Sequence, residues 1–312
     1  MTTKLIQIGK TELLVNPIGL GTNAVGGHNL FPNLDEEAGR ELVRTGLANG
    51  INFLDTAYVY GLGRSEEIIG EVVKESGNRS EIVIASKAAH KLSGNEMHLD
   101  NSPAFLKQAV EESLKRLQTD YIDLFYIHFP DQDTPKAEAV GALKQLKDEG
   151  KIRSIGVSNF TFDQLKEANK DGYVDVYQGE YNLLSRSAER ELFPYVTKQQ
   201  ISFVPFYPLA SGLLTGKYAS ETEISEKNRK RPQFQEGVYE QNLEKIELVR
   251  KIASAKGAEV AQIILAWYLS RPCIDVIIPG AKRADQVLHN LKTLEVQLTA
   301  EEIQEIDRIF PS

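Results

Sequence analysis

The chain has 312 residues, 41% of them hydrophobic, and a formal net charge of −8. This length permits one large domain or two medium ones. The negative charge argues against general binding of nucleic acids or anionic membranes, although a local basic pocket remains possible. The only cysteine, Cys273, excludes an intrachain disulfide and favours a reducing cytoplasmic compartment. We expect neither a signal peptide nor a membrane span, because the apolar runs are too short for either.

Short β-branched runs alternate with amphipathic stretches along the whole chain. A hairpin is predicted at the N-terminus, and a first barrel strand ends at Gly21. One helix is predicted from Asp35 to Asn49, two more begin near Ser65 and at Ser102-Pro103, another ends at Gly150, and a further one covers 164–169. Asp35 and Ser102 are the predicted N-caps. The other strands are predicted at residues 51–55, 82–85, 122–127, 152–157, 174–178, 201–205 and 274–278.

Eight strands with intervening helices predict an α/β fold, a (β/α)8 TIM barrel that forms one domain over residues 1–312. A doubly wound sheet is the alternative. Its dinucleotide fingerprint is missing, because Gly19-Leu20-Gly21 is not followed by a third glycine at the required spacing. The polar stretch 220–236 predicts a long, mobile surface insertion between strands seven and eight.

Four polar residues lie at or just beyond the ends of predicted strands: Asp55, Tyr60, Lys87 and His128. In a parallel barrel the C-terminal strand ends converge on one face, so these side chains should meet in one pocket. A phenol is a weak acid near pH ~10, and a neighbouring ammonium lowers its pKa. A carboxylate can hold the lysine, and an imidazole can orient a carbonyl oxygen. The set predicts protonation of an alkoxide during carbonyl reduction, with hydride from a nicotinamide.

Three further segments carry a family resemblance. Residues 50–61, 155–160 and 277–281 resemble signature patterns of the aldo-keto reductase superfamily, and the resemblance extends over essentially the whole chain. Within the superfamily the chain is most similar to bacterial reductases of the general-stress and inositol-operon type. The resemblance implies an NADP(H)-dependent enzyme that reduces aldehydes or ketones to alcohols.

The same resemblance implies a role for each matching residue. Tyr60 would be the proton donor, Lys87 would lower the pKa of Tyr60, Asp55 would hold Lys87, and His128 would orient the carbonyl. Lys282 and Arg283 could also pair with a 2′-phosphate, which favours NADPH. Cofactor contacts are implied for Gly21, Thr22, Ser158, Asn159, Gln178, Tyr207, Pro208, Leu209, Ser211, Gly212, Leu214, Lys217, Gly280, Lys282, Arg283, Gln286 and Asn290.

Other interpretations stay open from the sequence. A nicotinamide-binding sensor with little turnover is one, and a two-carboxylate hydrolase on the same barrel is another, although Glu180 has no evident partner for that chemistry. No metal site is expected, since the histidines lack ligand spacing. We expect a small carbonyl or alcohol substrate and no obligate protein partner. The substrate, the oligomeric state, any lid role of the insertion, and the choice between Arg229 and Arg231 as a cofactor contact are not determined.

Overall fold

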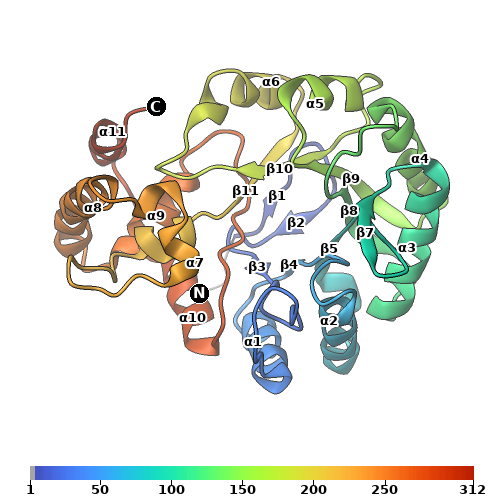
Figure 1. Ribbon diagram of the computed structural model, residues 1–312, viewed down its shortest axis with the longest axis horizontal. Coiled ribbons are helices and arrows are strands. Elements are labelled where there is room, and N and C mark those ends of the chain that lie inside the picture. Colours follow the sequence, from blue (N-terminus) through green and yellow to red (C-terminus); the bar gives the residue numbers. More distant parts are fainter. Residues whose placement is uncertain (1–3) are drawn as a thin grey trace.

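The computed structural model describes residues 4–312 and contains a curled sheet of parallel strands surrounded by helices (Figure 1). The seven strands of this sheet run in the order β11-β10-β9-β8-β5-β4-β3, and every pairing is parallel. The (β/α)8 prediction is thereby confirmed in its architecture. The strands are β3 (Leu20–Gly21), β4 (Phe53–Asp55), β5 (Val83–Ala88), β8 (Ile122–Ile127), β9 (Ile152–Ser158), β10 (Val176–Glu180) and β11 (Ser202–Phe206).

The predicted eighth strand, 274–278, is not a regular strand. The segment closes the barrel through single bridges, Ile18 to Ile277 and Gly21 to Gly280. On its other side, the Phe203 amide donates to the Cys273 carbonyl at 2.7 Å. The segment therefore completes the ring of backbone hydrogen bonds without forming a continuous ladder. Hydrophobic patterning cannot distinguish such a segment from a regular strand.

Helices surround the sheet at the positions that the capping signals predicted. Asp35 accepts two backbone hydrogen bonds at the start of α1, and Ser102 caps α3 with a proline in the first turn. The first half of the chain has α1 (Glu36–Ala48), α2 (Arg64–Ser76), α3 (Pro103–Leu117), α4 (Lys136–Asp148) and α5 (Phe162–Ala168). The second half has α6 (Leu192–Lys198), α7 (Glu226–Arg229), α8 (Val238–Ala255), α9 (Val260–Tyr268), α10 (Ala284–Leu291) and α11 (Ala300–Ile309).

Two small sheets lie outside the barrel. The predicted N-terminal hairpin is present as β1 (Ile6–Gln7) and β2 (Leu14–Val15). A second hairpin, β6 (His90–Ser93) with β7 (Glu96–Leu99), follows β5 and was not predicted. The insertion 220–236 is not wholly irregular, since it contains the short helix α7. Within residues 4–312, no helix combines the length and apolar character that crossing a membrane requires.

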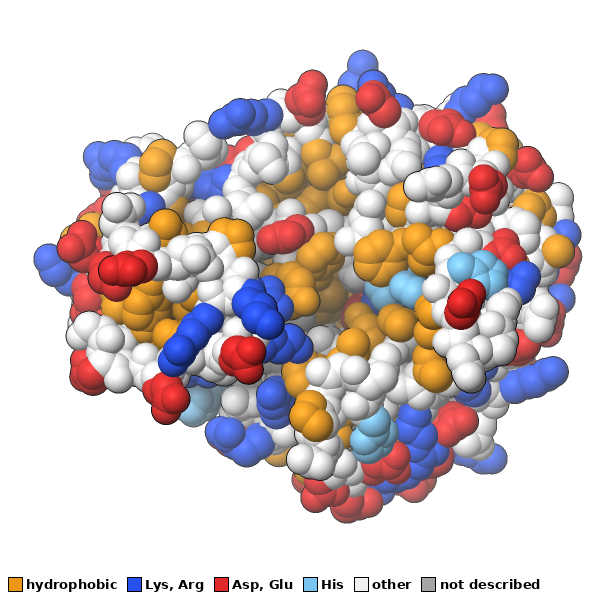
Figure 2. Space-filling model, viewed as in Figure 1, with side chains coloured by type: hydrophobic (Ala, Val, Ile, Leu, Met, Phe, Trp, Pro, Cys, Tyr) orange, Lys and Arg blue, Asp and Glu red, His pale blue; other side chains and the backbone are white. Residues whose placement is uncertain are grey.

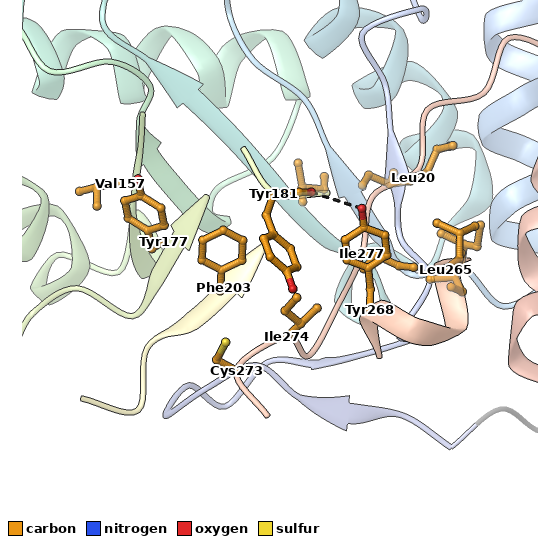
Figure 3. Packing of buried hydrophobic residues seen from close by; sticks show 14 of the residues in the cluster. Leu20, Val157, Tyr177, Tyr181, Phe203, Leu265, Tyr268, Cys273, Ile274 and Ile277 are labelled. Atoms are coloured by element: carbon orange, nitrogen blue, oxygen red, sulfur yellow. Dashed lines mark hydrogen bonds between the residues drawn. The ribbon is translucent and has the colours of Figure 1, made fainter. Parts of the chain in front are cut away.

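An aromatic cluster connects the sheet to α9 (Figure 3). Tyr181 packs edge-on against Phe203 and Tyr268, and its ring stacks on Trp267 with the centroids 5.8 Å apart. The buried Tyr268 hydroxyl donates to the carbonyl of Pro208 at 2.7 Å. The core therefore anchors the segment that leaves β11, where the sequence placed a cofactor loop.

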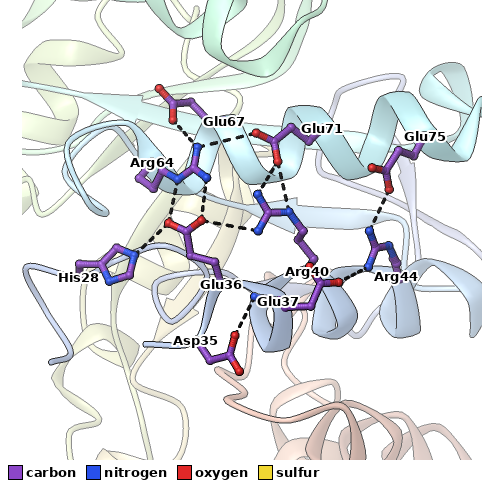
Figure 4. A network of polar contacts seen from close by, with 10 residues as sticks. All are labelled: His28, Asp35, Glu36, Glu37, Arg40, Arg44, Arg64, Glu67, Glu71 and Glu75. Atoms are coloured by element: carbon purple, nitrogen blue, oxygen red, sulfur yellow. Dashed lines mark hydrogen bonds and ion pairs between the residues drawn. The ribbon is translucent and has the colours of Figure 1, made fainter. Parts of the chain in front are cut away.

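Charged residues connect α1 to α2 on the outside of the barrel (Figure 4). Glu36 accepts from Arg64 at 2.6 Å and contacts His28 at 3.1 Å, while Arg40 pairs with Glu71. Hydrogen bonding to Arg64 lowers the pKa of Glu36 to about 2. The network connects the loop that precedes α1 to the start of α2, and these two segments border the predicted site.

Candidate active site

The four predicted catalytic residues meet at the C-terminal end of the barrel. Lys87 is fully buried and donates to the Asp55 carboxylate at 2.6 Å and to the Thr56 carbonyl at 2.8 Å. Its ammonium lies 5.3 Å from the centre of the Tyr60 ring. The rings of Tyr60 and His128 meet edge to face with their centroids 6.2 Å apart. Three strand ends and one short turn thus form a single cluster, as parallel-barrel geometry requires.

The turn that carries Tyr60 is fixed by the loop before α1. The Asn29 side chain accepts from the Gly61 amide at 2.7 Å and donates to the Val59 carbonyl at 2.9 Å. Gly61 has a positive φ of 69°, and an added Cβ there would clash with the Gly26 carbonyl. Both neighbours of Tyr60 in the chain are therefore held in place, and this orients the phenol toward Lys87.

The pKa values of Tyr60 and Lys87 are set by opposing effects. Burial raises the pKa of the Tyr60 phenol and outweighs the lowering effect of the Lys87 charge, so the net shift is upward. The resemblance implied the lowering contribution, and the structure adds a larger desolvation effect. For Lys87, burial alone lowers the pKa, but Asp55 and Tyr60 together raise it above its ordinary value. Lys87 therefore stays charged, and the Tyr60 phenol stays protonated at neutral pH.

The two histidines of the site are neutral. Burial lowers the pKa of His128 well below 6.5, and the nearby Lys87 charge acts in the same direction. Burial also lowers the pKa of His90, whose ring meets that of His128 at 5.5 Å. His90 belongs to the unpredicted hairpin β6–β7. A neutral imidazole can donate one N–H to a carbonyl oxygen without adding a charge to the pocket.

A cavity of about 580 Å³ opens above this cluster, and its lining includes Asp55, Tyr60 and His128. Figure 2 shows the hollow on this face, with histidines at one edge and lysines and arginines gathered at the opposite side. The residues predicted to hold the nicotinamide end all line the cavity. They are Gly21, Thr22, Ser158, Asn159, Gln178 and Tyr207.

Gln178 connects that end of the cavity to the catalytic cluster. Its amide nitrogen donates to Asp55 at 2.9 Å, so Asp55 holds both Lys87 and Gln178. Asn159 adopts a left-handed conformation with φ of 62° and donates to the His128 carbonyl at 3.0 Å. Such strain in a non-glycine residue is typical of functional sites.

The loop after β11 has a backbone conformation that lets a ligand approach the main chain closely. Tyr207, Ala210 and Ser211 all have positive φ, and Gly212 follows with φ of 88°. Pro208 is buried, Leu209 is half-buried, and the exposed Lys217 leaves its charge near Gly212. Leu214 is fully buried, so its side chain belongs to the core.

The residues predicted for the adenosine end lie around the start of α10. Gln286 accepts from the Lys282 amide at 2.8 Å and so caps the turn after Gly280. Arg283 pairs with Asp285 at 2.8 Å, whereas the Lys282 ammonium lies over the Phe31 ring at 4.7 Å. Asn290 is half-buried on the same helix. Of these two cations, Lys282 is therefore the one that forms no ion pair within residues 4–312.

The sequence reasoning missed Ser65, a buried residue at the start of α2. Its hydroxyl accepts from Thr56 at 2.9 Å and donates to the Thr22 carbonyl at 3.2 Å. Thr22 in turn donates to the Asp55 carbonyl at 2.8 Å. Ser65 thus ties the ends of β3 and β4 together from behind. Its place at a helix start, where serine often acts only as a cap, concealed this role.

Comparison with known proteins assigns the chain to a family. The Aldo/keto reductase family model matches residues 17–310, and the chain belongs to this family. The chain is 35% identical to aldo-keto reductase YhdN of Bacillus subtilis, over 97% of this chain and 92% of that protein.

Two solved structures extend the comparison. Glycerol dehydrogenase AKR11B4 from Gluconobacter oxydans superposes with a TM-score of 0.91 at 32% identity, covering 99% of this chain and 95% of that one. An aldo-keto reductase from Klebsiella pneumoniae in complex with NADPH gives a TM-score of 0.77 at 29% identity, covering 100% and 96%. The fold of the chain is thus that of known family members over nearly its whole length.

Proposed function

We propose that this chain reduces a small aldehyde or ketone to an alcohol with NADPH, and that Tyr60 donates the proton. The observation that carries the proposal is the buried Lys87, held by Asp55 at 2.6 Å and facing the Tyr60 ring. The family membership and the NADPH complex of a relative support the cofactor.

The chain's own residues account for the proton transfer. The Tyr60 phenol is protonated at neutral pH, so it can give its proton to the carbonyl oxygen. The Lys87 ammonium stabilises the phenolate that remains, and Asp55 keeps that ammonium in place. Neutral His128 donates a hydrogen bond that orients the carbonyl. Bound NADPH supplies the hydride. In the reverse direction the same phenolate accepts the alcohol proton.

The residues present fit a nicotinamide cofactor. The Gln178 amide oxygen is not used by the Asp55 contact. Ser158 is paired with Gln178 on the neighbouring strand, and its hydroxyl accepts from Asn159 and keeps its own proton to donate, so both an acceptor and a donor are available to a carboxamide there. The glycine-containing turn at Ser211 and Gly212 can approach a pyrophosphate closely. Lys282 offers a positive charge to a 2′-phosphate.

The proposal is tested by Tyr60→Phe, with Tyr58→Phe as the matched control. We expect kcat with a reactive aromatic aldehyde to fall about 10²–10⁴-fold in Tyr60→Phe, because the proton donor is lost. Tyr58 carries the same ring two residues earlier but packs against Arg116 and does not line the cavity. Full turnover by Tyr60→Phe would refute the proposed role.

The alternative of a cofactor sensor predicts tight NADPH binding with negligible turnover of every aldehyde. A hydrolase would need a free pair of carboxylates, but Asp55 is occupied by Lys87 and Gln178. We also place the protein in the cytoplasm, as the single buried cysteine suggests. Burial raises the pKa of the Cys273 thiol to about 12, so we assign it no role in the chemistry.

A further inference from the structure

Glu66 is a charged residue in the apolar layer between β5 and α2. It is the third residue of α2, and its side chain is fully enclosed. The surrounding cluster contains Ile84 of β5 and Ile68 and Ile69 of α2. A carboxylate in such a layer is costly to bury unless it is paired and hydrogen-bonded. Glu66 does not line the catalytic cavity, so it has no direct access to a substrate.

Both oxygens of the Glu66 carboxylate are used. One accepts from the Ser86 hydroxyl at 2.5 Å, and the other accepts from the Arg116 side chain of α3 at 2.6 Å. Ser86 is fully buried, and the Arg116 side chain is 18% exposed. Arg116 fits beside the start of α2 because Gly63 leaves room for it, since an added Cβ there would lie 2.6 Å from the Arg116 side chain. The carboxylate thus connects β5, α2 and α3 at one point.

These contacts reach Lys87 and Tyr60 through the main chain. Ser86 directly precedes Lys87 in β5. Because side chains alternate along a strand, Ser86 faces α2 while Lys87 faces the inside of the barrel. On the helix side, the amide of Ser65, which directly precedes Glu66, donates to the Tyr60 carbonyl at 3.2 Å. One carboxylate therefore holds both the strand position of Lys87 and the helix turn that supports Tyr60.

Stability alone is a poor explanation for the pair of Glu66 and Arg116. Desolvation offsets most of the attraction in a buried ion pair, and an apolar pair of similar volume often gives an equally stable fold. Short, directional hydrogen bonds to both carboxylate oxygens provide a fixed position instead. Position matters for proton transfer, because a misplacement of about 1 Å between reacting groups can lower a rate about 10²-fold.

We propose that Glu66 is a positioning residue for proton transfer, and that it sets the separation of Tyr60 and Lys87 through Ser86 and the first turn of α2. This inference rests on the proposed reductase function and adds a residue to it. Glu66 acts only through its neighbours and does not contact the reacting atoms.

Two substitutions at Glu66 test the inference in the reduction of 4-nitrobenzaldehyde with NADPH. Glu66→Met keeps the length of the side chain but removes both carboxylate acceptors, so kcat should fall about 10–10²-fold. Glu66→Gln can still accept from Arg116 with its oxygen and donate to the Ser86 oxygen with its nitrogen, so kcat should stay within about threefold of the wild-type value. The Kd of NADPH should not change in either variant, because Glu66 lies outside the cavity.

Ser86→Ala is a milder variant that covers the case in which Glu66→Met does not fold. It removes only the contact to β5 and leaves the pair of Glu66 and Arg116 intact. We expect it to lower kcat about fivefold, as for the loss of one hydrogen bond.

The pH profile separates positioning from a loss of folded protein. In the oxidation of benzyl alcohol with NADP⁺, kcat rises as Tyr60 loses its proton. The Lys87 charge lowers the pKa of Tyr60, so a phenol displaced from Lys87 ionises at higher pH. The rise should therefore move to higher pH in Glu66→Met and stay in place in Glu66→Gln. A smaller folded fraction would lower kcat by the same factor at every pH and leave the profile where it is.

Asp123→Asn is the matched control. Asp123 is a buried carboxylate that accepts from Arg79 at 2.8 Å and from the Ile84 amide of the same strand β5 at 3.0 Å. Ile84 lies near the N-terminal end of β5, away from Lys87. Asp123→Asn should therefore lower stability in urea unfolding, as Glu66→Met does, but leave kcat per folded molecule and the pH profile unchanged.

Each outcome supports or overturns the inference. Unchanged kcat in Glu66→Met, or in Ser86→Ala where Glu66→Met does not fold, would overturn it and leave the reductase function intact. Equal losses in Glu66→Gln and Glu66→Met would also overturn it and would assign the effect to the charge of Glu66. A shifted pH profile in Asp123→Asn would show that any weakening of β5 has this effect. No turnover by a folded wild-type protein that binds NADPH would overturn the reductase function together with the inference.

Discussion

The buried pair between Lys87 and Asp55 leads to a stability prediction that separates burial from geometry. Asp55→Asn removes one charge and keeps the shape, whereas Lys87 remains fully enclosed. A pair of unit charges 2.6 Å apart interacts by about 6 kcal/mol at an effective dielectric constant near 20, and desolvation of both groups offsets most of this. Removal of one partner leaves the other buried and uncompensated, which costs about 3–5 kcal/mol.

The matched control is Asp148→Asn. Lys144 and Asp148 form an ion pair at 2.5 Å, as short as the buried one, but their side chains are 34% and 63% exposed. Loss of this pair should cost at most about 0.5 kcal/mol, because water screens it. Urea unfolding of the two variants and the wild type at pH 7 measures both values. Equal losses in the two variants would refute the argument that burial makes the Asp55 pair matter.

The pH dependence follows from the sign of the shift. The pKa of Lys87 in the folded protein lies above its ordinary value of 10.5. The stability that the lysine gains from its partner is therefore fully present below pH ~10.5 and is lost only as the pH rises through the folded value. The contribution of Lys87 to wild-type stability should therefore stay constant from pH 6 to 9, whereas Asp55→Asn, whose buried lysine lacks the partner that raised its pKa, should become less destabilised as the pH rises through the lowered pKa. The same variant should lose turnover, because an unpaired buried lysine loses its proton more readily and the phenolate of Tyr60 loses its stabilising charge.

Three other predictions test separate parts of the site. Lys282→Ala should weaken NADPH binding about tenfold in a fluorescence titration and leave NADH binding nearly unchanged. Arg283→Ala should have the smaller effect, because the charge of Arg283 is already paired with Asp285. Equal losses of affinity for both cofactors in Lys282→Ala would contradict a 2′-phosphate contact. The pKa of His128 in the folded protein lies well below 6.5, so as the pH falls the unfolded chain takes up this proton first. The free energy of unfolding should therefore decrease as the pH falls below about 6.5. His128→Asn should make that decrease smaller. Ser65→Ala should cost about 1–2 kcal/mol in urea unfolding and lower kcat, since the ends of β3 and β4 lose a common hydroxyl; an unchanged kcat would reduce Ser65 to a packing role.

Much of the fold could be predicted because its signals are local. Asp35 and Ser102 mark helix starts through hydrogen bonds to their own neighbours, and a buried parallel strand such as 122–127 reads as a continuous apolar run. The segment 274–278 carries the same apolar signal and yet forms only single bridges. Ladder formation depends on the register of two distant partners, which one segment cannot encode alone. The hairpin β6–β7 was missed because its residues are mostly polar and exposed.

The same difference between local and long-range signals explains which features of the site could be predicted. The sequence predicts the group of Asp55, Tyr60, Lys87 and His128, because each lies at or just beyond the end of a predicted strand and the topology brings strand ends together. It does not predict their pKa values, since desolvation depends on everything packed around a group. The upward shift at Tyr60 arises from burial that exceeds the effect of a lysine the sequence did identify. Glu180 shows the converse, because its position at the end of a strand was visible but the cavity of about 690 Å³ that it lines was not.

Lysine illustrates why burial has to be known before a role is assigned. Lys87 and Lys282 both follow apolar segments and both approach aromatic rings, Tyr60 and Phe31. Lys87 is enclosed and paired, so its charge is fixed in position and acts on the acidity of a neighbouring phenol. Lys282 is exposed and has no carboxylate partner among residues 4–312, so its charge remains available to a ligand. In the proposed mechanism the first lysine therefore serves catalysis and stability together, whereas the second contributes to affinity and to the choice between NADPH and NADH with little effect on the fold.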